Sequence, residues 1–264
     1  MSTARMGAQY SIPVGDETVS AALTLPSGKG NVALAFAHGA GSDMNQAINV
    51  RLADALAARG VLVMRFNFLY TEKKKRSPDW PPVLIKTYRA AAEWLAARPE
   101  ANGRLLVLGG KSMGGRIASH LAALGDPCDG LWFLGYPLHP AGQPEKMRDA
   151  HLPDAKCPML FLEGTRDPLC DLDLLKPVLE KIGPRATLHV IEGGDHSLSV
   201  PKSSGRTAAD VERELVDVSV DWFGTLRKAA KPKAAPPKEP SPAPSASRPR
   251  AGTTTRGSRS ARRT

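Results

Sequence analysis

Short apolar runs alternate with longer amphipathic stretches through residues 1–226, and this alternation restricts the possible folds more than any other feature. Seven apolar runs have the length of buried strands: 19–25, 32–37, 61–68, 105–108, 131–136, 159–162 and 187–191. Five stretches have the length of helices: 45–58, 82–97, 113–124, 171–182 and 208–229. Buried strands that alternate with helices predict an α/β fold, in which helices cover both faces of a mostly parallel sheet.

The charged residues divide the chain near residue 229. The formal net charge of the 264 residues is +10. Residues 1–226 hold 25 basic and 25 acidic side chains, whereas residues 227–264 hold 11 basic and one acidic. Because the C-terminal end has almost no large apolar residue, we expect a folded domain over 1–229 and a disordered basic tail over 230–264. The simplest role for this tail is a solvating appendage, although its charge suits weak binding of nucleic acid or another polyanion.

Several classes of protein are excluded by what the sequence lacks. No apolar run reaches the roughly 18 to 20 residues of a membrane-spanning helix, and residues 1–30 lack the apolar segment of a secretory signal. The three cysteines form no C-x-x-C pair, which argues against a disulfide scaffold. No dinucleotide fingerprint, phosphate-binding loop or metal-ligand motif is present, so we expect no cofactor and no metal. These features favour a cytoplasmic protein.

A G-x-S-x-G pattern at 110–114 marks a candidate nucleophile. It follows the apolar run 105–108 and precedes the helical stretch 113–124. In such a strand–turn–helix context the serine occupies a sharp turn, and its small neighbours let strand and helix approach each other. The turn exposes the Ser112 hydroxyl and directs the backbone N–H of Met113 toward a developing oxyanion. The alternative is a glycine-rich connector that carries a serine by chance.

The partners that a serine nucleophile needs follow later strands. A serine hydroxyl requires a general base, which an acid must orient. Asp167 follows the run 159–162, and His196 follows the run 187–191, so both belong to the same sheet edge as Ser112. The order serine, acid, histidine is that of one large class of serine hydrolases. We therefore predict Ser112 as nucleophile, His196 as general base and acid, and Asp167 as the carboxylate that holds the imidazole tautomer.

Other residues compete for these roles less well. Asp195 adjoins His196, but neighbours in sequence rarely orient each other's rings, and Glu163 comes too early after its strand. His120 lies too far along its predicted helix to reach the serine. Cys170 lacks a turn of small residues, which favours a structural thiol. The remaining candidate bases in strands or loops are His139, His151 and His189.

A second oxyanion donor is expected after the run 32–37. That run ends in His38-Gly39-Ala40-Gly41, and glycines let the main chain approach a substrate carbonyl closely. The backbone N–H of Ala40 is the best candidate, with Gly41 next. We expect His38 to brace this loop rather than to react, and a turn without any ligand is the alternative.

Four motifs together carry a family resemblance: HGAG at 38–41, GKSMGG at 110–115, EGTRDP at 163–168 and GGDHSL at 193–198. They resemble the α/β-hydrolase superfamily over residues 1–229. FAHGAGSDMN, MRFNFLY and GGKSMGGR resemble its dienelactone-hydrolase-related branch, with relatives of testis-expressed protein 30 and of subunit 3 of the non-specific lethal histone-acetyltransferase complex. The resemblance implies a doubly wound, mostly parallel eight-stranded sheet and the triad roles assigned above. Dienelactone hydrolases use a cysteine nucleophile, so their substrate does not follow from it.

The function predicted is a serine hydrolase that cleaves a small ester, thioester or amide through an acyl-enzyme. Residues 137–158 are too few for a large helical cap, so we expect a shallow pocket beside this loop and the 69–82 segment. The basic run at 73–76 is either a solvated loop or a rim that attracts anionic substrates. The alternatives are a non-catalytic scaffold on the same fold and an adaptor that binds nucleic acid through its tail.

Overall fold

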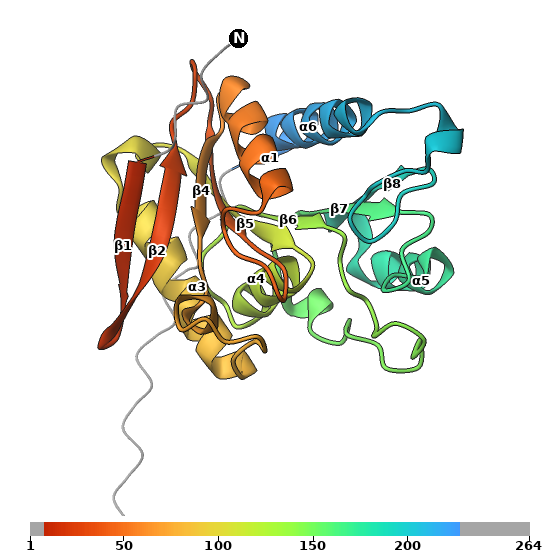
Figure 1. Cartoon of the computed structure of the whole chain (residues 1–264), viewed down its shortest axis with the longest axis horizontal. Helices are drawn as coiled ribbons and strands as arrows, with labels where there is room; N and C mark the ends of the chain where they lie inside the picture. Colours follow the sequence, from red (N-terminus) through yellow and green to blue (C-terminus); the bar gives the residue numbers. More distant parts are fainter. Residues whose placement is uncertain (1–7, 228–264) are drawn as a thin grey trace, which may run out of the picture. The chain divides into compact units, whose positions relative to one another are not determined.

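An eight-stranded sheet forms the centre of the computed structural model, which describes residues 8–227 (Figure 1). The strands are β1 (Ala8–Val14), β2 (Glu17–Thr24), β3 (Val32–Ala37), β4 (Leu62–Phe66), β5 (Leu105–Lys111), β6 (Gly130–Leu134), β7 (Met159–Gly164) and β8 (Ala186–Ile191). Their order is β1-β2-β4-β3-β5-β6-β7-β8. The strands from β3 to β8 are parallel, and β1 and β2 join antiparallel at one edge. The predicted mostly parallel, eight-stranded α/β fold is confirmed.

Helices cover both faces of this sheet, so its central strands are buried on both sides (Figure 1). The helices are α1 (Ala47–Ala58), α2 (Leu69–Glu72), α3 (Pro81–Ala96), α4 (Met113–Ala123), α5 (Leu172–Ile182) and α6 (Ala208–Thr225). Short 3-10 helices occupy Pro99–Ala101, Leu152–Asp154, Gly183–Arg185 and Lys202–Ser204. Leu34 and Phe36 of β3 belong to the core beneath α1 and α6, whereas Ala35 and Ala37 belong to the core beneath α3, α4 and α5. Successive side chains of β3 thus fill opposite cores.

Three elements differ from the sequence prediction. The edge strand β1 was not predicted, because Pro13 and its exposed polar residues hide a strand that pairs on one side only. No helix was predicted at the start of the 69–82 segment, but its first residues form the short helix α2. Strand β5 extends to Lys111, three residues beyond the predicted run. Gly109 continues the pairing with β6, and a Cβ at Gly109 would lie 2.3 Å from the Trp132 carbonyl oxygen.

The predictions for the C-terminal end of the chain concern residues that the structure does not describe. The proposed domain boundary at 229 and the basic tail at 230–264 both lie beyond residue 227 and stay predictions. Between residues 8 and 227, no helix combines the length and apolar character required to cross a bilayer.

Candidate active site

Ser112 occupies the sharp turn between β5 and α4. Its backbone φ is 50° and ψ is −117°, a conformation that a residue other than glycine adopts only under strain. The turn is tightly packed, since a Cβ at Gly110 would lie 2.4 Å from the Ala37 carbonyl oxygen and one at Gly114 would lie 2.5 Å from it. Glycines at these two positions therefore let strand, helix and the loop after β3 converge on Ser112.

The structure brings Ser112, His196 and Asp167 into one hydrogen-bonded chain. His196 Nε2 lies 2.8 Å from Ser112 Oγ, and His196 Nδ1 lies 2.7 Å from Asp167 Oδ2. The second oxygen, Asp167 Oδ1, accepts a hydrogen bond of 2.7 Å from the Leu169 N–H. The Asp167 side chain is 0% exposed and that of His196 is 23% exposed. A buried carboxylate thus holds one ring nitrogen while the other faces the serine at the solvent side.

The competing acids have other partners. Asp195 Oδ1 accepts hydrogen bonds of 2.7 Å from the Ser197 N–H and 3.0 Å from the Ser199 N–H, which shape the loop that carries His196. Glu163 Oε1 instead accepts a hydrogen bond from the Tyr136 N–H at 2.6 Å.

The other histidines and Cys170 also lie outside the relay. The rings of His120 and His151 stack on each other with centroids 3.6 Å apart. His139 Nε2 accepts a hydrogen bond from the Asp171 N–H, and His189 pairs with a carboxylate of α6. Cys170 is 2% exposed, and burial raises the pKa of its thiol, as suits a structural residue.

The predicted oxyanion donors, Ala40 and Met113, line the same cavity as Ser112. Within residues 8–227, the backbone N–H of neither residue donates to another backbone group. The loop that carries Ala40 is held by His38, whose Nδ1 donates to the Gly39 carbonyl at 2.8 Å and whose Nε2 accepts from the Phe68 N–H at 3.3 Å. Burial lowers the pKa of His38, which favours this neutral, bracing ring.

Lys111, which the sequence analysis did not single out, supports the loop of His196. It is 6% exposed at the end of β5, and its ammonium group donates a hydrogen bond to the His196 carbonyl oxygen. Burial lowers the pKa of Lys111, while the negative charge of Asp167 acts in the opposite direction. A lysine inside an apolar strand, directly before the candidate nucleophile, was the signal available in the sequence.

Glu163, near the end of β7, is a buried carboxyl group. Its side chain is 0% exposed, and its Oε2 has no hydrogen-bond partner among the described residues. Burial raises its pKa well above the usual range, and the charge of Asp167 raises it further, whereas the charge of Lys111 lowers it. Glu163 is therefore protonated in the folded protein at pH values where an exposed glutamate is ionised.

We expect Glu163→Gln to make the folded protein less sensitive to rising pH. Below the usual carboxyl pKa of 4.5, Glu163 is protonated in both folded and unfolded chains. Above it, only the unfolded chain releases the proton, so wild-type stability falls as pH rises toward the raised pKa, whereas glutamine does not titrate. Urea denaturation from acidic to neutral pH should show a growing advantage for Glu163→Gln. Glu180→Gln, which replaces an exposed glutamate, is the control. If the free energy of unfolding depends on pH in the same way for the wild type and for Glu163→Gln, the expectation is wrong.

The cavity in front of Ser112 has a volume of about 450 Å³ and no cap. Its rim comes from residues 78–84 and from the segment after β6. The only helix within 137–158 is the 3-10 turn Leu152–Asp154, so the predicted absence of a large cap is confirmed. The basic run 73–76 is exposed and does not line this cavity.

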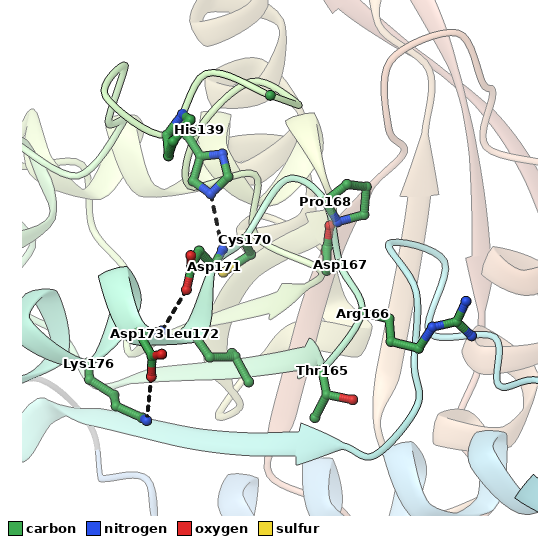
Figure 2. Close-up of a pocket in the computed structure, with 12 residues that line it drawn as sticks. His139, Thr165, Arg166, Asp167, Pro168, Cys170, Asp171, Leu172, Asp173 and Lys176 are labelled. Carbon is green, nitrogen blue, oxygen red and sulfur yellow. Dashed lines mark hydrogen bonds and ion pairs between the residues drawn. The ribbon is translucent and has the colours of Figure 1, made fainter.

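A second cavity, of about 610 Å³, has Asp167 among its lining residues (Figure 2). His139, Arg166 and Lys176 are among its lining residues, but Ser112 and His196 are not. Over the described residues, no group of three or more His, Cys, Asp or Glu side chains is placed to hold a metal ion. Of these two cavities, the smaller is the one that Ser112 lines.

The comparisons with known proteins agree with this fold. A family model described as an alpha/beta hydrolase domain matches residues 30–224, most of the chain. The chain belongs to the α/β-hydrolase family. A dienelactone hydrolase from Anabaena variabilis is 22% identical, with a TM-score of 0.67 over 84% of this chain and 100% of that one. An α/β serine hydrolase without a lid from Xanthomonas campestris is 23% identical, with a TM-score of 0.64 over 86% of this α/β-hydrolase and 98% of that chain.

A third similar structure is an α/β serine hydrolase homologue from Coxiella burnetii. It is 21% identical, with a TM-score of 0.65 over 82% of this chain and 99% of that one. At these identities, the three structures establish the fold that this α/β-hydrolase shares with them.

Proposed function

We propose that the protein is a serine hydrolase that cleaves a small ester, thioester or amide through an acyl-enzyme. One observation carries the proposal: the continuous hydrogen-bonded chain from Ser112 Oγ through both nitrogens of His196 to the buried carboxylate of Asp167. Such a chain makes a neutral hydroxyl a competent nucleophile, because the imidazole takes its proton as the new bond forms.

The geometry supports a two-stage reaction. Ser112 Oγ attacks the carbonyl carbon while His196 Nε2 accepts the hydroxyl proton, and the charge of Asp167 stabilises the resulting imidazolium. The carbonyl oxygen becomes an oxyanion that faces the backbone N–H groups of Ala40 and Met113. His196 then donates its proton to the leaving group, which leaves an acyl ester on Ser112. A water molecule that gives its proton to His196 hydrolyses this ester and releases the acid.

Each part of the site contributes a separate share of the rate. One oxyanion donor lowers the barrier by roughly 2.7–4 kcal/mol in enzymes of this kind. The strained turn at Ser112, which costs on the order of 1–3 kcal/mol, keeps the hydroxyl in position before substrate binds. The site therefore needs little rearrangement to react.

The proposal includes membership of the dienelactone-hydrolase-related branch, which the sequence motifs suggest, and a cytoplasmic location, which the sparse cysteines favour. The dienelactone hydrolase among the similar structures supports the branch, while the nucleophile proposed here is Ser112 rather than the cysteine of dienelactone hydrolases.

Labelling with a fluorophosphonate tests the proposed function. The reagent phosphonylates only a serine that a neighbouring base activates. We expect one labelled site in the wild type, no labelling in Ser112→Ala, and wild-type labelling in Ser197→Ala, which removes an exposed hydroxyl one residue from His196. Absence of labelling in a folded wild-type protein would contradict the proposal and favour the non-catalytic scaffold.

A further inference from the structure

Two arginines share the cavity with Ser112. Arg116 lies on α4, about one turn beyond the serine, and Arg148 lies on the segment after β6. Both line the cavity that Ser112, Ala40 and Met113 also line. Two positive charges therefore face the space that a substrate of Ser112 has to enter.

Neither guanidinium is neutralised by the protein. Within residues 8–227, no carboxylate forms an ion pair with Arg116 or Arg148. The Nε of Arg116 is buried and has no hydrogen-bond partner there. Burial lowers the pKa of Arg116, and the charge of Arg148 lowers it further. A buried donor without an acceptor is unfavourable. The two guanidiniums that line the cavity without a carboxylate partner can pair with an anion that enters it.

The backbone of Arg148 is fixed before any ligand arrives. Its N–H donates to the Leu138 carbonyl at 2.8 Å, and its carbonyl accepts from the hydroxyl of Tyr136 at 2.8 Å. Tyr136 is 0% exposed, which anchors this contact in the core. A segment tethered on both sides loses little entropy when its side chain binds an anion.

One acidic residue, Asp79, also lines the cavity. Its Oδ1 lies 3.7 Å from the ammonium nitrogen of Lys75 on the exposed basic run, so part of its charge is already balanced. Asp79 Oδ2 is buried without a partner. Two guanidiniums against one partly balanced carboxylate leave the cavity with an excess of positive charge.

We propose that Arg116 and Arg148 form an anion-binding subsite, so that the substrate of Ser112 is an ester, thioester or amide that carries a carboxylate. The inference deepens the proposed function and rests on it. Planar guanidiniums bind carboxylates through paired, charge-assisted hydrogen bonds, which a neutral acyl chain cannot supply. The carboxylate thereby orients the scissile carbonyl toward Ser112.

Matched pairs of esters test the subsite by turnover. The mono-p-nitrophenyl ester of adipic acid is compared with p-nitrophenyl hexanoate, which places the charge on the acyl side. The acetyl ester of p-hydroxybenzoate is compared with phenyl acetate, which places it on the leaving group. In at least one pair, Arg116→Gln and Arg148→Gln should each lower the charged-to-neutral ratio of kcat/KM by about tenfold or more. Arg213→Gln, which removes an exposed arginine of α6, should leave both ratios unchanged.

A variant that removes the negative charge of the cavity and a measurement of adipate binding complete the test. Asp79→Asn should raise the preference for the charged ester. Titration calorimetry with adipate, which needs no turnover, should show binding to the wild type that the double variant Arg116→Gln/Arg148→Gln loses. Adipate binding without fluorophosphonate labelling would overturn the proposed hydrolase and retain the anion subsite. Two results would overturn the subsite and retain the proposed hydrolase. One is a labelled protein whose charged-to-neutral ratios do not change in the arginine variants. The other is adipate binding that the arginine variants do not weaken.

Discussion

Replacing His196 with alanine should lower kcat by a factor on the order of 10⁶, to the level of Ser112→Ala. The reason is geometric: His196 Nε2 is the base that lies 2.8 Å from Ser112 Oγ, and its Nδ1 is held by Asp167. Without the ring, the serine proton has no acceptor in the ground state and the leaving group has no donor. Residues that act as one unit are expected to give similar losses singly and together.

The measurement is initial-rate kinetics on p-nitrophenyl esters, with fluorophosphonate labelling in parallel. His189→Ala is the matched control, since this histidine lies on β8, the strand that leads to His196, and pairs with Glu214 of α6. We expect that control to keep activity within a few-fold of wild type. An active His196→Ala variant would remove the histidine from the mechanism.

Asp167→Asn should lower kcat by about 10⁴-fold while the protein stays folded. The Leu169 N–H donates to Oδ1, so the asparagine carbonyl oxygen is expected to stay at that position and its NH₂ group to face the ring. His196 Nδ1 then has to accept a hydrogen bond, which moves the ring proton to Nε2. A protonated Nε2 cannot take the proton of Ser112, although the distances between the three residues barely change.

Asp195→Asn is the comparison that decides which carboxylate acts on the ring. Asp195 uses one oxygen to accept from two backbone N–H groups, and the asparagine carbonyl retains that acceptor. We therefore expect a change in kcat of less than about tenfold. Kinetics on the same esters, with thermal unfolding to verify folding, separate the two variants. A larger loss for Asp195→Asn than for Asp167→Asn would assign the acid to Asp195.

The residues with patterned surroundings were predictable from the sequence. Ser112 has glycines on both sides at a fixed spacing, and each glycine proves to lie against backbone with no room for a Cβ. Asp167 and His196 follow parallel strands, so their shared sheet edge was implied by strand order alone. Edge strand β1 was missed, because pairing on one side leaves a weak apolar pattern.

The residues without a pattern emerged only from the tertiary structure. Nothing in the sequence around Lys111 indicates its partner, and only the folded structure brings its ammonium group to the His196 carbonyl oxygen. Arg148 lies in a loop with no periodicity, and only the packing of that loop on Tyr136 brings it to the cavity that Arg116 also lines. Glu163 was weighed as the triad acid, but the carboxylate that contacts the His196 ring is that of Asp167, and Glu163 accepts a hydrogen bond from the Tyr136 N–H instead.

The sequence by itself determined the α/β architecture and the identity of the candidate triad. Strand periodicity and turn chemistry depend on residues that are close together in the sequence, so they can be recognised without the tertiary structure. The tertiary structure decided which charges surround that triad and which of them lack a partner. Charge balance in a cavity depends on side chains from segments far apart in the chain, such as α4 and the loop after β6, and their distances are set by packing rather than by spacing along the sequence.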